Sequence, residues 1–187
     1  MKYLIAGLGN IGPEYSNTRH NIGFKVLDAL AEASNISFKD KRYGSVAEYN
    51  YKGRIFVLLK PSTYMNRSGL SVNYWLKKHK LSLERLLVIV DDVALPFGTL
   101  RIRPKGGDGG HNGLISINQV IGSQDYARLR FGIGNEYHPG QQVNYVLSEW
   151  PNEELEQLPA RLETCAEIIK SFGTIGLELT MTRFNNQ

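Results

Sequence analysis

The sequence predicts an α/β fold: a single three-layer domain with a mixed, mostly parallel, twisted sheet flanked by helices on both faces. Strand-like and helical patterns alternate along the chain, which is the arrangement of α/β domains. Several strand-like runs are apolar on both faces, such as LLVIV at 86–90, as expected of strands in a covered sheet. The 187 residues, 42% hydrophobic and 21% charged, suit one globular unit, so we expect a single domain over residues 1–187.

Six segments have the composition of strands: 2–8, 45–51, 54–60, 86–92, 99–103 and 128–134. The second and third are separated only by a short turn that contains Gly53, which predicts an antiparallel hairpin. The hairpin would make an otherwise parallel sheet mixed.

Four segments have helical periodicity: 22–33, 68–80, 111–122 and 151–172. The last of them aligns five apolar side chains, namely Leu155, Leu158, Leu162, Cys165 and Ile169. Pro159 should kink or restart this helix, because proline removes a backbone donor. Cys165 is the only cysteine, which excludes an internal disulfide and a cysteine metal cluster, and its apolar neighbours indicate a core residue.

The charge is unevenly distributed. Residues 148–187 hold seven glutamates and three basic residues, a net −4, so the first 147 residues carry +8 within a total of +4. A basic body with an acidic C-terminal helix suggests one face suited to a polyanion, although a basic surface kept for solubility explains the charge equally well. No apolar run approaches the ~18 residues of a membrane span, and the N-terminus is typical of a first strand rather than a secretion signal, so we expect a cytoplasmic protein with no membrane contact.

The first strand is followed by a pattern that resembles a dinucleotide fingerprint, formed by Gly7, Gly9 and Gly12. In a Rossmann site the helix opens within the glycine turn, so that its amides face the phosphates. Here the helical pattern starts only at Ile22, and the next strand ends without an acid for a ribose. We therefore reject nicotinamide or flavin binding and expect the glycines to turn the chain sharply.

Polar side chains follow several predicted strands, where ligands gather in open α/β sheets. They are Asn10, Tyr15, His20, Tyr64, Met65, Asn66, Asp91, Asp92, His111 and Asn112. Each has an ordinary structural alternative, such as capping of a turn by Asp91. Their combination nevertheless favours a site.

The residue types fit ester hydrolysis. His20 titrates near neutral pH and can accept a proton from water, a carboxylate can orient the ring, and asparagine amides can donate to an oxyanion. Because the sequence has no G-x-S-x-G elbow and its cysteine is in a helix core, water is the expected nucleophile. The four histidines show no metal-ligand spacing, so we expect no metal.

Five motifs in order, GLGNIGPEYSNTRHNIGF, KPSTYMNRSG, VIVDDVALPFG, RPKGGDGGHNGL and RLRFGIG, closely resemble bacterial-type peptidyl-tRNA hydrolase. The match runs from Met1 to about Gly134, with a compatible C-terminal helix. The resemblance implies a monomer without a cofactor that cleaves the ester between a peptide and the 3′ end of tRNA.

The resemblance also implies roles for individual residues. His20 takes the place of the general base, Asp91 that of the carboxylate that orients it, and Asn10 that of the residue that recognises N-blocked substrates. Positions that hold the peptide, the tRNA end or the attacking water are matched by Tyr15, Tyr64, Asn66 and Asn112. Tyr64 departs from the phenylalanine common in the family. Bases that touch tRNA phosphate are matched by Arg101, Arg103 and Arg130, whose guanidinium groups can grip a phosphate bidentately.

Two alternatives remain open at this point. Plant organellar splicing factors resemble the same family, so the chain could be a non-catalytic RNA-binding relative; the lack of a targeting extension before Met1 argues for the enzyme. A small-molecule esterase would require the basic residues to be incidental, and a weak salt dependence would identify it.

Overall fold

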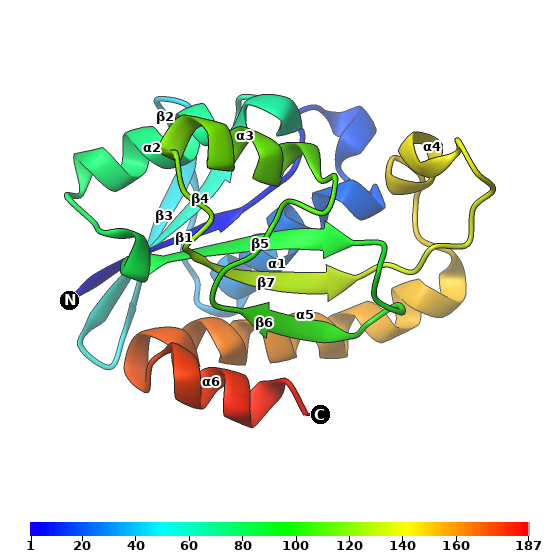
Figure 1. Ribbon diagram of the computed structural model, residues 1–187. Coiled ribbons are helices and arrows are strands. Elements are labelled where there is room, and N and C mark those ends of the chain that lie inside the picture. The colour runs from blue at the N-terminus through cyan, green and yellow to red at the C-terminus, as the bar shows by residue number, and fades with distance from the viewer. Residues whose placement is uncertain (187) are drawn as a thin grey trace.

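The computed structural model describes residues 1–186 and contains one seven-stranded sheet of order β2-β3-β4-β1-β5-β7-β6 (Figure 1). The strands are β1 Lys2–Gly7, β2 Lys39–Lys41, β3 Gly44–Tyr51, β4 Arg54–Pro61, β5 Leu86–Asp92, β6 Leu100–Arg103 and β7 Ala127–Gly132. The four central strands β4, β1, β5 and β7 are parallel, whereas β3 is antiparallel to β4 and β6 is antiparallel to β7. The mixed sheet and the β3–β4 hairpin are as predicted.

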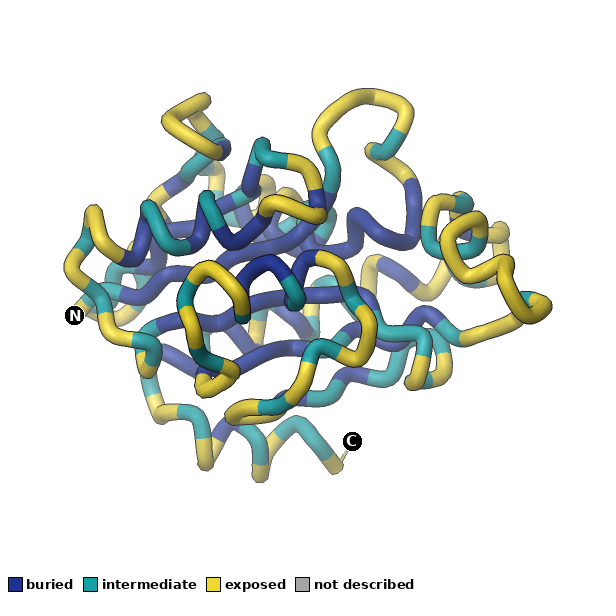
Figure 2. Tube along the Cα trace, turned by 45° about the horizontal axis from the view of Figure 1, so that its top comes forward, coloured by how far each residue is buried: buried dark blue, intermediate teal, exposed yellow. Residues whose placement is uncertain are grey.

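Helices cover both faces of this sheet. The helices are α1 Ile22–Ala33, α2 Ser68–Lys78, α3 Asn112–Ile121, α4 Gln142–Val146, α5 Asn152–Thr174 and α6 Leu177–Phe184. One hydrophobic cluster joins α1 and α5 to one face, and a second joins α2 and α3 to the other (Figure 1). The strands between them are buried along most of their length (Figure 2). The predicted three-layer architecture is confirmed.

Helix α5 corrects two expectations. It continues through Pro159 without restarting, because the buried stripe of Leu158, Cys165 and Phe172 holds the helix on the sheet despite the missing donor. Leu155, which was expected on that stripe, is 44% exposed. Cys165 is fully buried, and burial raises the pKa of its thiol to about 12, so it acts as a packing residue as predicted.

Three elements had no sequence signal strong enough to predict them. They are β2, whose residues are all exposed, and the short helices α4 and α6. Short 3₁₀ helices also interrupt the loops: η1 Pro13–Tyr15, η2 Arg19–Asn21, η3 Met65–Arg67 and η4 Leu83–Arg85. Of these, η2 and η3 carry residues of the candidate site.

Two glycines set how closely α1 approaches β1. A Cβ on Gly7 would lie 2.3 Å from the carbonyl oxygen of Gly23, and a Cβ on Gly23 would lie 2.3 Å from the amide of Leu8. The missing side chains let the start of α1, and with it η2, lie against the carboxyl end of β1. Because α1 begins at Ile22, its first turn does not close on the glycine turn as a Rossmann helix would.

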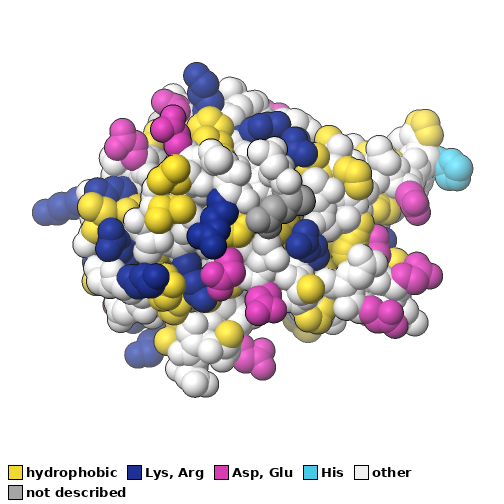
Figure 3. Space-filling view, turned by 90° about the horizontal axis from the view of Figure 1, so that it is seen from below, with side chains coloured by type: hydrophobic (Ala, Val, Ile, Leu, Met, Phe, Trp, Pro, Cys, Tyr) yellow, Lys and Arg dark blue, Asp and Glu magenta, His cyan; other side chains and the backbone are white. Residues whose placement is uncertain are grey.

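No helix in the part of the chain that the structure describes is long and apolar enough to cross a membrane. The face formed by α5 and α6, seen from below in Figure 3, carries acidic and basic side chains side by side. A uniformly basic surface is therefore not found on this side of the molecule.

Candidate active site

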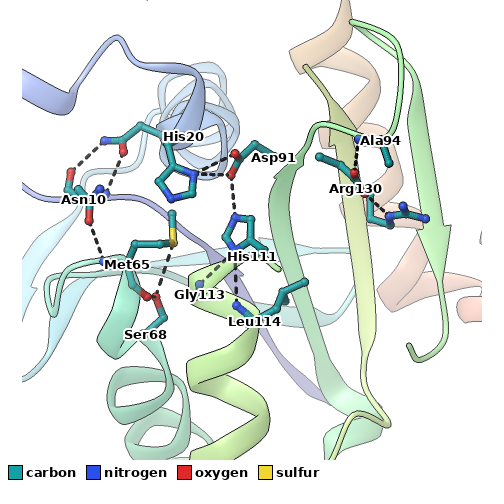
Figure 4. Close-up of polar contacts among 12 residues, drawn as sticks. Asn10, His20, Met65, Ser68, Asp91, Ala94, His111, Gly113, Leu114 and Arg130 are labelled. Carbon is teal, nitrogen blue, oxygen red and sulfur yellow. Dashed lines mark hydrogen bonds and ion pairs between the residues drawn. The ribbon is translucent and has the colours of Figure 1, made fainter. Parts of the chain in front are cut away.

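The candidate site lies at the carboxyl ends of the parallel strands, where the loops after β1 and β5 meet the start of α3 (Figure 4). The loop after β1 brings His20 on η2, the end of β5 brings Asp91, and the glycine-rich loop before α3 brings His111. Residues 20, 91 and 111 are thus gathered by the sheet from three distant parts of the chain.

His20 and Asp91 form a buried pair. Nδ1 of His20 lies 2.9 Å from Oδ2 and 3.0 Å from Oδ1 of Asp91. Only 9% of His20 and 4% of Asp91 are exposed. Since an ionised carboxylate can only accept, Nδ1 carries the proton and donates it, which leaves Nε2 unprotonated in the neutral ring. Asp91 therefore does not cap a turn; the neighbouring Asp92 does, because its Oδ1 accepts from the Ala94 amide at 2.8 Å.

His111 contacts the same carboxylate from the other side. Its Nε2 lies 2.8 Å from Asp91 Oδ1, while its Nδ1 accepts from the amides of Gly113 at 3.1 Å and Leu114 at 3.4 Å. Because backbone amides can only donate, Nδ1 is the acceptor and Nε2 is the donor. The start of α3 thus fixes the tautomer of His111. Sequence reasoning placed His111 near the site but did not foresee this bond.

His20 and Asp91 shift each other's pKa. Burial lowers the pKa of His20, but the charge of Asp91 and the hydrogen bond to it act in the opposite direction and leave the pKa raised above its ordinary value. Burial likewise raises the pKa of Asp91, but the charges of His20 and His111 and their hydrogen bonds outweigh it and leave this pKa well below its usual range. Asp91 is therefore ionised at neutral pH and stabilises an imidazolium form of His20.

Residues 20, 91 and 111 also form a group that could hold a cation, since their ligand atoms lie within 4.8 Å of one another. Each nitrogen that faces Asp91, however, is a hydrogen-bond donor at 2.8–3.0 Å, and a metal ligand must present a lone pair instead. The arrangement fits proton transfer better than metal binding.

Asn10 is held rigidly beside this group. The backbone amide of Asn10 donates to Oδ1 of Asn21 at 2.9 Å, and Nδ2 of Asn21 donates to the Asn10 carbonyl at 2.9 Å. Oδ1 of Asn10 accepts from the Met65 amide at 2.7 Å, so its amino group is directed away from η3 (Figure 4). Asn21, which is buried next to His20, is a further site residue that sequence reasoning missed.

Four other predicted residues lie in η1, in or directly before η3, and at the start of α3. Tyr15 is half-buried in η1, and Tyr64, Asn66 and Asn112 are exposed. Tyr64 has a φ of 60°, a conformation that side chains rarely adopt, immediately before η3. No contact of the described residues joins these four side chains directly to His20, so their roles stay predictions.

The predicted arginines lie on β6 and on β7, two adjacent strands. Arg101 is paired with Arg130 and Arg103 with Arg128, which places all four on the sheet face that α3 covers. Arg103 and Arg130, together with Lys105, line a cavity of about 480 Å³ that also reaches Asp91 and His111. Arg101 does not line it. Arg130 is ion-paired with Asp92, and Arg128 donates to three backbone carbonyls, which gives it a structural role.

Arg19 connects the turn that carries His20 to the segment between α4 and α5. Its guanidinium donates to the Glu149 carbonyl at 3.0 Å and to Ser148 Oγ, and it pairs with Glu154 at 3.4 Å. It also lies 4.3 Å from the centre of the Tyr145 ring. Nothing in the sequence motif pointed to these long-range contacts.

Comparison with known proteins agrees with this geometry. A family model described as peptidyl-tRNA hydrolase matches residues 4–187. The peptidyl-tRNA hydrolase of Phocaeicola vulgatus is 57% identical over 187 residues, and that of Porphyromonas gingivalis is 54% identical over 185 residues; each match covers at least 99% of this chain and 100% of the relative. The crystal structure of peptidyl-tRNA hydrolase from Acinetobacter baumannii is similar with a TM-score of 0.92 and 34% identity, over 98% of this chain and 94% of that one. The chain therefore belongs to the peptidyl-tRNA hydrolase family.

Proposed function

We propose that this protein hydrolyses the ester that joins an N-blocked peptide to the 3′ end of tRNA and releases free tRNA and peptide. The observation that carries the proposal is the fixed protonation pattern of residues 20, 91 and 111. Two histidines donate to one buried carboxylate, and only Nε2 of His20 is left as an acceptor. Membership of the family supplies the substrate class.

The reaction follows from this pattern. Nε2 of His20 removes a proton from a water molecule as the water oxygen attacks the ester carbonyl carbon. The resulting imidazolium is stabilised by Asp91, and the tetrahedral intermediate collapses by breaking the bond to the ribose oxygen. The same Nε2 then returns the proton to that oxygen, so that no net proton remains on the enzyme.

Asn10 is suited to recognise the peptide side of the ester. Its carbonyl oxygen is used by the Met65 amide, which leaves its amino group to donate to a carbonyl of the substrate. A free aminoacyl ester lacks the acylated nitrogen and hence that carbonyl, and would lose this hydrogen bond. The binding of the peptide, the tRNA end or the attacking water is completed by four residues on η1, on or beside η3 and at the start of α3, namely Tyr15, Tyr64, Asn66 and Asn112.

The nucleotide side of the substrate faces the cavity with Arg103, Lys105 and Arg130. A phosphate there would meet two guanidinium groups and an ammonium group at one end of the crevice. Arg101, on the same sheet face, lies outside the cavity and contributes to the basic field rather than to the grip. We further propose that the protein works as a monomer in the cytoplasm, without a metal or cofactor.

A single-turnover assay with N-acetyl-aminoacyl-tRNA tests the proposal. Wild type should release the N-acetyl-amino acid and free tRNA, and His20→Ala should lose about 10²–10⁴-fold in rate, the usual loss on removing a positioned general base. A folded His20→Ala protein that retains more than a tenth of wild-type activity would contradict the assignment. The absence of turnover in wild type, with tRNA binding intact, would favour the RNA-binding relative instead, a reading that the names of the matched relatives do not support.

A further inference from the structure

A cavity of about 650 Å³ lies at the edge of the sheet, between the β2–β3 hairpin and the C-terminal half of α2. We call it the edge cavity; basic and aromatic side chains line it, among them Lys39, Lys41, Arg42, Tyr74, Trp75 and Lys78. β2 forms one edge of the sheet, whereas the cavity with Arg103 and Arg130 lies on β6 and β7 at the other (Figure 1). None of the residues assigned to the proposed function lines the edge cavity.

The alternation of side chains along β2 decides which charges reach the edge cavity. Lys39 lies opposite Val46 in the pairing with β3, and Lys41 follows two positions later. Val46 packs against the hydrophobic cluster of α2, so both lysines lie on the sheet face that α2 covers. Asp40, between them, lies on the other face, where its Oδ1 accepts from Ser45 Oγ at 2.9 Å. The strand therefore presents two ammonium groups to the cavity and turns the carboxylate away.

The positive charge of the edge cavity is not compensated. Four exposed cationic side chains line it: Lys39, Lys41, Arg42 and Lys78. Within the described residues 1–186 none of them forms an ion pair, and Glu48 is the only carboxylate in the lining. Four cationic groups against one acid give a net charge of +3. Burial and the charge of Lys2 lower the pKa of His79, which also lines the cavity and stays neutral at neutral pH. Such a field suits an anionic partner.

Two tyrosine rings accompany these charges. The guanidinium of Arg42 lies 5.2 Å from the centre of the Tyr43 ring and 5.5 Å from that of Tyr74, and the two rings meet edge to face at 5.5 Å. Tyr74 is half-buried on α2, and 36% of Tyr43 is exposed. Tyr43 has a φ of 64°, in the left-handed region where glycine or asparagine would be less strained. The hairpin thus holds an exposed aromatic ring beside the lysines at a cost in backbone strain, as residues at binding sites often do.

Cationic side chains beside exposed aromatic rings are the combination that binds unpaired nucleotides. The phosphates pair with the cationic groups, while a base stacks on an aromatic ring. Lys39 and Lys41 are about 6.6 Å apart along β2, so they can meet successive phosphates of an extended strand. An acidic peptide would use the charges but not the rings, and a duplex has no free base face to offer.

We propose that the edge cavity is a non-catalytic site for a single-stranded nucleic acid, separate from the site for the ester. β2 is four strands away from β5, which carries Asp91, a distance of about 19 Å at about 4.8 Å per strand. The proposed function directs the acceptor end of tRNA towards β7 and β6, away from β2. The edge cavity therefore binds a second strand and not the substrate. The inference uses the proposed function only for this direction.

The test measures the fluorescence anisotropy of a labelled, unstructured RNA dodecanucleotide with the protein. Wild type should bind the single strand about tenfold more tightly than its duplex, because stacking requires free base faces. Lys41→Glu should weaken binding about fivefold or more and reduce the slope of log binding constant against log salt concentration by about 0.7. The same measurement with DNA of that sequence identifies the kind of strand, which is the one bound more tightly.

Tyr43 provides a test that does not depend on charge. Tyr43→Gly removes the ring and relieves the positive φ, so the hairpin should still form while binding of the single strand weakens about tenfold. Tyr43→Phe keeps the ring and should keep the affinity. Unchanged binding in Tyr43→Gly would contradict the stacking role.

Matched controls separate the edge cavity from charge in general and from the substrate site. Lys52→Glu makes the same charge change at an exposed turn at the opposite end of β3 and should keep the wild-type affinity. Arg103→Ala should also keep it, although this variant raises KM for N-acetyl-aminoacyl-tRNA. Lys41→Glu and Tyr43→Gly should leave both KM and kcat for that substrate unchanged.

Three results would overturn the proposal: equal affinities for the single strand and the duplex, equal losses in Lys41→Glu and Lys52→Glu, or a KM for N-acetyl-aminoacyl-tRNA that rises in parallel with the loss of oligonucleotide binding. Binding to phosphatidylglycerol vesicles that depends on Lys41, without binding of the single strand, would assign the cavity to a membrane surface and overturn it as well. The proposed function fails separately, when wild type does not cleave N-acetyl-aminoacyl-tRNA.

Discussion

Replacement of Asp91 by asparagine should inactivate the enzyme through a change of tautomer. His111 can only donate to the side chain at position 91, because its Nδ1 is occupied by the amides of Gly113 and Leu114. In the Asp91→Asn variant this donor would engage the oxygen of the new amide, and the amino group of that amide would then face Nδ1 of His20. Nδ1 of His20 lies 2.9 Å from the Oδ2 position and 3.0 Å from the Oδ1 position, so the new amino group would oppose the proton on Nδ1. This opposition favours the tautomer that carries the proton on Nε2, in which His20 has no acceptor for a proton from water.

The expected loss is large. A catalytic histidine held in the wrong tautomer costs roughly 10⁴-fold in kcat, and the lost attraction to the imidazolium acts in the same direction. KM should change little, because Asp91 is buried behind the two rings. Single-turnover hydrolysis of N-acetyl-aminoacyl-tRNA, with tRNA binding measured separately, gives both quantities. Asp92→Asn is the matched control, since that carboxylate contacts Ala94 and Arg130 and neither histidine.

A double variant tests the tautomer argument itself. His111→Asn keeps a side chain that can cap α3 but withdraws the long donor from position 91. In Asp91→Asn/His111→Asn the new amide at position 91 is free to turn its oxygen towards His20. The double variant should therefore be about tenfold or more as active as Asp91→Asn alone, whereas independent sites would have additive losses of activity. A double variant that is no more active than Asp91→Asn would refute the reasoning, as would a larger loss in Asp92→Asn than in Asp91→Asn.

Three further predictions concern pH, tRNA binding and stability. Because Asp91 raises the pKa of His20, kcat should fall at acid pH with an apparent pKa above 6.5. In Asp91→Asn the acid limb of the pH–rate profile of the residual activity should move to lower pH. An acid limb at the wild-type position would contradict this. Arg103→Ala should raise KM, leave kcat nearly unchanged and reduce the slope of log binding constant against log salt concentration by about 0.7–0.9. Cleavage of a blocked aminoacyl ester of adenosine should stay at the wild-type rate. An equal loss on that minimal substrate would place Arg103 in the catalytic crevice. Arg130→Ala should behave in the same way, although it also leaves Asp92 without its partner. Arg19→Met should lower the free energy of unfolding by about 3 kcal/mol, because it removes the hydrogen bonds of a buried guanidinium to Ser148 and Glu149 as well as its pair with the half-buried Glu154. Arg183→Met at an exposed site should cost less than about 0.5 kcal/mol in urea denaturation.

The parts of the fold that could be predicted from the sequence were those whose apolar residues follow a clear pattern. The run at 86–92 matches β5 and the pattern at 22–33 matches α1, because both bury nearly continuous apolar surface. Strand β2, in contrast, consists of Lys39, Asp40 and Lys41, and forms only because the adjacent strand offers its edge. Such an element is stabilised by register and backbone hydrogen bonding, which leave no trace in side-chain periodicity.

The candidate site likewise has features that could be predicted from the sequence and features that could not. His20, Asp91 and Asn10 could be predicted, because polar residues after buried strands converge at one edge of a parallel sheet. The bond between His111 and Asp91 could not, because its direction depends on how two backbone amides of α3 hold the ring. Residue type and spacing predict which groups meet, whereas the tautomer of each ring is set by local backbone geometry.

Arg19 shows why a residue beside a catalytic one can escape sequence analysis. Its neighbour His20 faces the crevice, but the Arg19 guanidinium faces the opposite way and contacts residues 145–154, more than a hundred positions along the chain. The same segment includes Val146, which lines the cavity with Arg103 and Arg130. The turn that holds the base and the wall of the cavity proposed for the nucleotide are therefore anchored by one side chain. A local motif cannot reveal such an anchor, because the partners of Arg19 are distant in the sequence. They lie next to Arg19 only in the folded chain, where α5 packs on the sheet and Glu149 pairs with Thr18.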